Sequence, residues 1–505
     1  MNPPSTLIRQ ARLVPIGTPA AGGGEPVDLR ITDGIVTEVG TGLRPAPDEL
    51  MIEAAGRWAI PGLWDQHVHM GQWARTRIQV DLSGSTSPDE VIARILQHLR
   101  TLPSDSTAAV FGFGFRAAGW ARQPTVEELD LAVADRPVVL ISGDVHNGWL
   151  NSRALWAFGA RPAEGPIEEN EWFEICARLD ELPADPSLLD RAYREAAADA
   201  AARGVVGIVD MEFGRGFADW PARTAAGIDQ LRVRPAAYAD RLDEVIDAGL
   251  RDGQVLDEAG LVTMGPLKII SDGSLNTRTA YCCDPYAAGA GDHARGKQNF
   301  DAAELTHLLR RAHAHGLRVA VHAIGDAAAA VALDAFERTG ARGTIEHAQL
   351  VRREDLARMA ALGVTASVQP AHLLDDRELT EQIWADREDR CFLLRSMHEA
   401  GVALALGSDA PVAALDPWLA MAAAVHRGKP GDEPWRPAEA ISSTLALASS
   451  TDGQVTLAVG GRGDVVLLDA EPLAAASDTA GASMALRNMS VTATVMAGRL
   501  TYCDL

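Results

Sequence analysis

Eight short apolar runs between residues 62 and 409, most followed by a helix-like stretch, constrain the fold of this chain more than any other feature. Repeated βα units of this kind are typical of a parallel sheet covered by helices. Eight is the strand number of a TIM barrel, so we expect an α/β fold built on a (β/α)8 barrel. The runs are "GLWDQHVH" (62–69), "GVVGIVDM" (204–211), "RPAAYA" (234–239), "LKIIS" (267–271), "RVAVHA" (318–323), "TIEHA" (344–348), "TASVQ" (365–369) and "VALALGSD" (402–409).

Segments outside this series predict two further units. Residues 26–60 and 463–502 carry short β-like pieces without helical periodicity, so we expect a composite β-sandwich domain from residues 1–60 and 455–505, beside a barrel domain at 61–454. Residues 75–200 hold extra strand-like pieces such as "AAVFGFGF" and "PVVLIS", which exceed one βα loop. We therefore expect an inserted subdomain after the first barrel strand, lying over the barrel mouth.

Charge and composition indicate a small-molecule partner. The formal net charge is −23, from 46 basic and 69 acidic residues, which repels nucleic acid and anionic membranes. No apolar run approaches the roughly 18 residues of a membrane helix, and the N-terminus lacks a secretory pattern, so we expect a cytoplasmic protein. Since homodimers are the commonest assembly of soluble proteins, a homodimer is the oligomer to expect if this chain assembles. An odd number of cysteines without CxxC spacing predicts reduced thiols: Cys176, Cys282, Cys283, Cys391 and Cys503.

Metal-binding residue types gather at the carboxyl ends of the predicted strands, where barrel enzymes keep their chemistry. His67 and His69 are two residues apart on one strand, so both side chains point the same way and can bind one metal. His322, His347 and Asp409 follow on later strands. These donors suit zinc and its first-row neighbours, and five of them exceed what one catalytic zinc requires.

Lys268 lies in the middle of an apolar strand, on the face that also carries Ile270. Considered by itself, a lysine there is better explained as a snorkelling or ion-paired side chain. Beside the histidines, burial favours a neutral amine, which can add carbon dioxide and form a carbamate that bridges two cations. Two divalent ions would hold a bridging hydroxide as nucleophile, and Asp409 would transfer its proton to the leaving group.

Seven stretches resemble the amidohydrolase superfamily, and within it the YtcJ-like branch that includes N-substituted formamide deformylases. The resemblance implies a binuclear metal barrel with a composite β-sandwich and assigns the metal ligands to His67, His69, carboxylated Lys268, His322, His347 and Asp409. It extends from about residue 30 to residue 470. The matching stretches are "PGLWDQHVHM", "GDVHNGWLNSRAL", "LKIISDGSLNTRTA", "VHAIGDAAA", "IEHAQ", "QPAH" and "GSDAPV".

The resemblance also implies that "HNGWLNS" and "DGSLNTR" form the substrate pocket. The expected substrate contacts are His146, Trp149, Asp272 and Arg278. Both stretches also fit structural roles. The first is compatible with a loop before a helix that is capped by Asn151 or Ser152. In the second, Asp272 and Arg278 could form an ion pair with each other instead of binding substrate. The sequence departs from the family at "GDVHNGW" and at Asn276, so the substrate does not carry over.

These features predict a metal-dependent hydrolase that cleaves a C–N bond in an amide, formamide or related acyl compound. The alternatives are a mononuclear deaminase and a catalytically silent barrel that only binds. A serine hydrolase and a dinucleotide enzyme are disfavoured, since neither a GxSxG elbow nor a GxGxxG fingerprint occurs. Aromatic residues of the inserted region suggest an apolar or aromatic substituent on the substrate: Trp73, Phe111, Phe113, Phe115, Trp120, Trp149, Trp156, Trp172 and Phe173.

Overall fold

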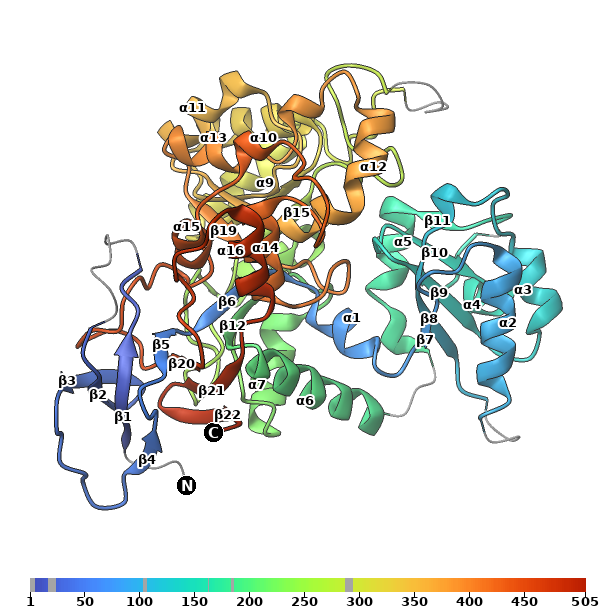
Figure 1. Ribbon diagram of the computed structural model, residues 1–505. Coiled ribbons are helices and arrows are strands. Elements are labelled where there is room, and N and C mark those ends of the chain that lie inside the picture. Colours follow the sequence, from blue (N-terminus) through green and yellow to red (C-terminus); the bar gives the residue numbers. More distant parts are fainter. Residues whose placement is uncertain (1–4, 17–23, 103–106, 162, 183–185, 287–293) are drawn as a thin grey trace.

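The computed structural model describes residues 5–16, 24–102, 107–161, 163–182, 186–286 and 294–505 (Figure 1). Three parts are evident: a β-rich part that holds both ends of the chain, a central α/β part, and an inserted subdomain beside it. The central part has a TIM-barrel-like α/β fold, and it carries the candidate site.

All eight predicted runs form strands in the central part, the third as two short strands separated by Ala236. They pair in parallel, in the orders β13-β12-β6 and β14-β15-β16-β17-β18-β19. Their continuous apolar sequences suit strands buried on both faces. The bounds are β6 (Leu63–Val68), β12 (Val205–Asp210), β13 (Arg232–Pro235), β14 (Ala237–Tyr238), β15 (Leu267–Ile270), β16 (Val319–Ala323), β17 (Gly343–His347), β18 (Thr365–Val368) and β19 (Leu404–Leu406).

The last strand of this series returns to the first. Val68 and Ala410 form a parallel bridge, and the Asp409 backbone N–H donates to the His67 carbonyl oxygen at 2.7 Å. The Ser408 backbone N–H also donates to Asp65 Oδ1 at 3.0 Å. The segment after β19 is thereby held against the end of β6, which brings Asp409 beside the two histidines of that strand.

Helices follow most of these strands and cover them. In α9 (Ala302–Ala314) Asp301 caps the helix, because its side chain accepts hydrogen bonds from the Ala303 and Glu304 backbone N–H groups. The other helices of the central part are α1 (Met70–Arg75), α6 (Pro186–Ala202), α7 (Gly216–Ala225), α8 (Leu242–Asp247), α10 (Asp326–Thr339), α11 (Arg353–Ala361), α12 (Leu373–Ile383), α13 (Leu394–Glu399), α14 (Pro417–His426) and α15 (Ser443–Ala448).

Strands from both ends of the chain complete one β-rich part. The order is β22-β21-β20-β5-β1-β2-β3, with β4 paired to β1, and β5 joins β20 in antiparallel register. Apolar residues of the two terminal segments, such as Ile8, Leu29, Val465 and Val495, share one core. The bounds are β1 (Ser5–Leu13), β2 (Val27–Thr32), β3 (Ile35–Gly40), β4 (Leu50–Glu53), β5 (Trp58–Pro61), β20 (Val465–Leu468), β21 (Val491–Met496) and β22 (Arg499–Cys503). Helix α16 (Thr479–Arg487) lies between β20 and β21 and packs on α14.

The inserted subdomain has its own sheet, in the order β11-β10-β9-β8-β7. The expected range of 75–200 is too long at its end, because Tyr193, Ala196 and Ala200 of α6 pack with Val68 and Val205 in the core of the central part. The bounds are β7 (Val80–Asp81), α2 (Pro88–Leu99), β8 (Val110–Phe115), α3 (Val126–Ala132), β9 (Val138–Ser142), β10 (Asn147–Leu150), α4 (Ser152–Ala157), β11 (Ile167–Glu168) and α5 (Glu169–Cys176).

Two further expectations concern the chain as a whole. The five cysteines are free thiols, as predicted. Within the described residues, no helix combines the length and the apolar character that a membrane crossing requires.

Candidate metal centre

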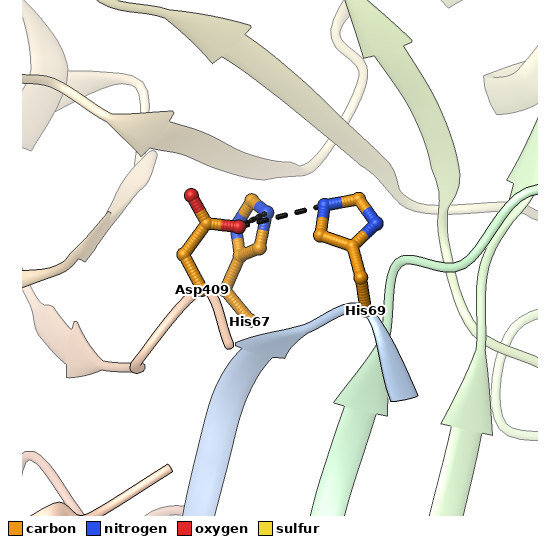
Figure 2. Close-up of side chains that lie close together, drawn as sticks. All are labelled: His67, His69 and Asp409. Carbon is orange, nitrogen blue, oxygen red and sulfur yellow. Dashed lines mark ion pairs between the residues drawn. The ribbon is translucent and has the colours of Figure 1, made fainter. Parts of the chain in front are cut away.

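His67, His69 and Asp409 converge at the end of β6 (Figure 2). Asp409 Oδ1 lies 3.5 Å from His67 Nε2 and 3.4 Å from His69 Nε2. One ligand atom from each of the three residues falls within 4.8 Å of the others. Two imidazoles and a carboxylate at this spacing match a first-row metal site.

A second group shares Asp409 and includes a histidine that the sequence interpretation missed. His347, His372 and Asp409 also bring one ligand atom each within 4.8 Å. Asp409 Oδ2 lies 3.8 Å from His372 Nε2, so the two carboxylate oxygens face different histidines. The ring centroid of His347 is 4.5 Å from that of His322 and 6.1 Å from that of His372. His322 therefore belongs to the same cluster.

Two of these residues have unusual backbone conformations. His347 has φ = 67° and Asp409 has φ = 58°, in the left-handed region that residues other than glycine rarely adopt. Both lie at or just after the carboxyl end of a strand, where the left-handed turn breaks the alternation of the strand. Such strained residues concentrate at functional sites.

Lys268 completes the cluster, as its position on β15 predicted. Its side chain is 1% exposed and lines the same cavity as Ile270, while Leu267 and Ile269 pack in the apolar core. Its Nζ lies 3.3 Å from His67 Nε2. Burial lowers the pKa of Lys268, although the charges of Glu346 and Asp409 oppose this shift. The environment therefore favours the neutral amine more than water does.

Burial also keeps the imidazoles neutral. It lowers the pKa of His69 to about 3 and that of His372 to about 4. It lowers the pKa values of His67, His322 and His347 well below their usual value, and the charge of Lys268 adds to this shift. Neutral imidazole is the form that binds metals.

The hydrogen bonds of the cluster fit a bound cation. His67 Nδ1 lies 2.6 Å from Glu346 Oε2, and both side chains are buried, so Nε2 is the nitrogen directed at the cluster. A carboxylate on the second nitrogen is the usual support of a metal-binding histidine. Among the described residues, three buried histidine nitrogens have no hydrogen-bond partner: His69 Nδ1, His347 Nδ1 and His372 Nε2. These donors suit one or more divalent ions.

A small cavity of about 30 Å³ lies directly over the cluster, next to an outer cavity of about 50 Å³. Asp144 and His146 of the inserted subdomain line both cavities, and Phe173 of α5 lines the inner one. The inserted subdomain therefore contributes to both cavities at the cluster. A larger cavity, of about 670 Å³, is lined by strand starts such as Val319 and Thr344 at the opposite end. It contains no histidine among its described lining residues.

Trp149, a predicted substrate contact, is not among the described residues that line either cavity. It is fully buried among the apolar residues of the inserted subdomain, where its ring packs near Phe115. Its Nε1–H donates to the Thr125 carbonyl oxygen at 2.8 Å. The side chain therefore points into the subdomain core, since the alternation along β10 places it away from the cavity.

Asp272, another predicted substrate contact, is held by the protein itself and is not among the described residues that line either cavity. It is fully buried, and its two oxygens accept hydrogen bonds from the backbone N–H groups of Tyr281, Ile324 and Gly325. Its Oδ1 lies 3.4 Å from His322 Nε2. Burial raises the pKa of Asp272 to about 7. Asp272 thus joins two loops and faces a histidine of the cluster.

The other two predicted contacts have different outcomes. His146 faces the cluster, with its ring centroid 5.7 Å from that of His322. Asn151 is the cap of α4, so this stretch also has the structural role of a loop before a helix. Arg278 is half-buried and is not among the described residues that line either cavity.

Few of the aromatic residues expected near the substrate reach the metal cavity. Of the nine, Phe173 alone is among its described lining residues. Phe213, which the sequence interpretation missed, lines it too, and its ring centroid is 5.6 Å from that of Phe173 and 6.0 Å from that of His69. Trp73 and Phe113 line a separate cleft, and Trp156 is 84% exposed.

Several site residues besides Phe213 were absent from the prediction. His372 lies in "QPAH", directly after β18, so its position at a strand end was a usable signal. Glu346 precedes a predicted ligand within β17, but the sequence does not show that it meets His67. Asp144 follows β9 in a turn and Glu169 is the first residue of α5, and no local pattern distinguishes them.

Comparisons with known proteins agree with this site. The chain is 27% identical to an N-substituted formamide deformylase of Arthrobacter pascens over 504 residues, covering 90% of each chain. It is 27% identical to the putative amidohydrolase YtcJ of Bacillus subtilis (strain 168) over 429 residues, covering 79% of each. A structure of an uncharacterized metal-dependent hydrolase from Pyrococcus horikoshii OT3 superposes with a TM-score of 0.77 at 25% identity, covering 93% of this chain and 98% of that one.

The family model described as "Amidohydrolase family" matches residues 51–502, a range that contains every residue of the histidine cluster. Members of this family are metal-dependent, and the cluster provides the donors for such a metal. By the extent of this match, the chain belongs to the amidohydrolase family.

Proposed function

We propose that the protein is a hydrolase that cleaves a C–N bond of a small amide, formamide or related acyl compound. One observation carries the proposal: two groups of metal donors share Asp409, and buried Lys268 lies beside them. The likeness to an N-substituted formamide deformylase supports the bond type. The donor set does not identify the substrate.

The chain's residues suit two divalent ions, with zinc as the expected metal. His67, His69 and Asp409 would hold one, and His322 and His347 the other, with a carbamate on Lys268 between them. His372 is a further candidate ligand, since it forms the second donor group with His347. Bound ions of this kind polarise a carbonyl group and lower the pKa of water to about 7.

Asp409 is the proposed general acid and base. Its carboxylate lines both the inner and the outer cavity, so it faces the histidines on one side and the space for substrate on the other. A group in this place can take a proton from the attacking water and deliver it to the departing nitrogen. The other buried residues exclude bulk water from that exchange.

The inner cavity favours an apolar substituent on the substrate. Phe173 and Phe213 form one wall, with Val145, Ile270 and Val412 nearby on the lining. The other described lining residues are polar, so the apolar contacts of the cavity come from this group of side chains alone. A panel of N-acyl amines that differ only in the bulk of the apolar group tests this, and equal rates across the panel contradict it.

We also propose that the two parallel sheets form one closed (β/α)8 barrel. A closed barrel requires the last strand to meet the first, and the bridge between Val68 and Ala410 supports this contact between β19 and β6. It also requires the two sheets to join, and the continuation of β13 into β14, with only Ala236 between them, supports this junction. The composite β-rich part then corresponds to a β-sandwich domain of residues 1–60 and 455–505, beside a barrel domain of 61–454.

Metal analysis and a substrate screen test the function together. We expect two divalent ions per chain and turnover of at least one N-substituted amide, with release of the corresponding amine and not of ammonia. Lys268→Ala should lower the metal content below two and the rate on the order of 100-fold or more, since a charge-stabilising group is lost. Lys297→Ala, whose side chain lines neither cavity, is the matched control.

The competing functions predict other results. A mononuclear deaminase would bind one ion and release ammonia. A catalytically silent barrel would bind metal and turn over no amide, ester or lactam. Full activity with two ions in Lys268→Ala would overturn the bridging role of the lysine.

A further inference from the structure

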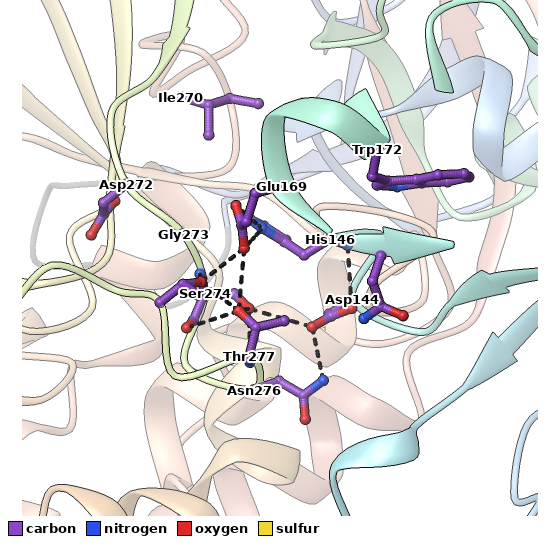
Figure 3. A network of polar contacts seen from close by, with 12 residues as sticks. Asp144, His146, Glu169, Trp172, Ile270, Asp272, Gly273, Ser274, Asn276 and Thr277 are labelled. Atoms are coloured by element: carbon purple, nitrogen blue, oxygen red, sulfur yellow. Dashed lines mark hydrogen bonds and ion pairs between the residues drawn. The ribbon is translucent and has the colours of Figure 1, made fainter. Parts of the chain in front are cut away.

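Glu169 is a buried carboxylate at the junction of the inserted subdomain and the barrel loop that follows β15 (Figure 3). Its side chain is 2% exposed. Its Oε1 accepts hydrogen bonds from Thr279 Oγ1 at 2.8 Å and from Thr277 Oγ1 at 3.3 Å. Both threonines belong to the barrel loop. A carboxylate removed from water in this way is costly unless its oxygens are paired, and these hydroxyl groups satisfy one of them.

The same carboxylate also holds His146. His146 Nδ1 lies 3.3 Å from both Oε1 and Oε2 of Glu169, and the Glu169 backbone N–H donates to the His146 carbonyl oxygen at 3.0 Å. His146 lines both the inner and the outer cavity, and its ring centroid lies 5.3 Å from that of Phe173. Because Nδ1 is engaged by Glu169, Nε2 is the nitrogen left for a ligand in the cavity.

The backbone around this pair is strained on both sides. Val145 has φ = 64° and Glu169 has φ = 53°, and a β-branched residue at positive φ is a genuine outlier. Neighbouring contacts hold the strained segments: Trp172 Nε1–H donates to the Val145 carbonyl oxygen at 2.6 Å, and Asp144 accepts from Asn276 Nδ2 at 2.8 Å. Strain persists only where the surroundings over-determine it, which is common at ligand-contacting sites.

We propose that Glu169 is a positioning residue, which fixes the ring of His146 over the metal cavity so that His146 Nε2 hydrogen-bonds the substrate. The proposal rests on the hydrolase function proposed above. It gives the inserted subdomain a defined role, because Glu169 and His146 both belong to that subdomain. The loop after β15 supplies only Thr277 and Thr279, the hydroxyl partners of Glu169. The competing possibility is a purely structural role, in which Glu169 only docks the subdomain on the loop.

A double-mutant cycle distinguishes the two roles. Glu169→Ala and His146→Ala should each lower kcat/KM on the order of 100-fold, the cost of a misplaced contact at the reacting group. If Glu169 acts through His146, the double variant should be no worse than either single variant. Glu169→Gln keeps an oxygen that can accept from Thr279 and His146, so it should recover most of the activity lost in Glu169→Ala. Multiplicative losses in the double variant would overturn the proposal.

Two measurements complete the experiment. In Glu169→Gln, metal content and melting temperature should stay close to the wild-type values. Thr125 caps α3 in the inserted subdomain, and its replacement in Thr125→Ala should leave kcat and KM unchanged. Nitrogen NMR of labelled histidine in the holoenzyme reports the proton on His146 Nδ1 without any turnover. If the protein hydrolyses no amide, but the proton is present in wild type and absent in Glu169→Ala, then the proposed hydrolase function is wrong and the positioning role of Glu169 stands. A His146 signal that is identical in wild type and Glu169→Ala overturns the role of Glu169 alone.

Discussion

At the scale of single residues, burial decides the chemistry of this site. His67, His322 and His347 are almost fully buried and have lowered pKa values, so they stay neutral and keep a lone pair for a metal. The same burial disfavours the ammonium of Lys268. The sequence predicted the histidines because each is polar at the end of an apolar strand, and Lys268 because it interrupts an apolar strand. The supporting carboxylate Glu346 comes from a contact between strands that are far apart in the chain.

Glu346→Gln tests that support. Removing the charge beside His67 Nδ1 should weaken metal binding about 10- to 100-fold, as is usual for partners of metal-binding histidines. Competition with a chelator of known affinity measures the change. Gln66→Ala is the control, because Gln66 precedes His67 on the same strand but bonds to Asp452 on the opposite face. An unchanged metal affinity in Glu346→Gln would show that Glu346 serves stability alone.

At the scale of elements, strand periodicity predicted more than loop sequence did. All eight predicted runs form strands. The inserted subdomain was less predictable. Trp149 and His146 are three residues apart near the start of β10, yet one enters the subdomain core and the other faces the cluster. Only the pairing of β10 with β9 and β11 sets which side chain points inward.

Trp149→Phe tests this assignment. The variant loses the hydrogen bond to Thr125, which should cost about 1 kcal/mol of stability, while kcat and KM stay unchanged. Urea unfolding and steady-state kinetics measure the two effects. A large rise in KM with unchanged stability would restore Trp149 as a substrate contact.

At the scale of the whole molecule, the site is assembled from distant segments. His67, Lys268 and Asp409 lie far apart in the chain and meet only when the ends of β6, β15 and β19 come together. The ligand-binding geometry therefore does not exist in the unfolded chain. A metal that binds only the folded state stabilises it by mass action.

Metal removal should therefore lower the melting temperature. At a free metal concentration 1,000 times the Kd, binding to one site contributes about 4 kcal/mol. Scanning calorimetry of the chelated protein and of the same sample after metal is restored measures the difference. His69→Ala is the control, since its melting temperature should respond less to added metal. Equal melting temperatures with and without bound metal would contradict this coupling.

The sequence by itself determined the class of fold, the order of the strands and six residues of the metal cluster, because strand periodicity and strand-end positions are local properties of the chain. Tertiary structure alone decided the residues around that cluster. Glu346 reaches His67, Glu169 reaches His146, and Phe213 joins Phe173 through contacts between remote segments. It also placed Trp149 in the core of the inserted subdomain and Asp272 on the backbone N–H groups of two loops, because the register of a sheet and the satisfaction of buried backbone groups depend on neighbours that no local pattern specifies.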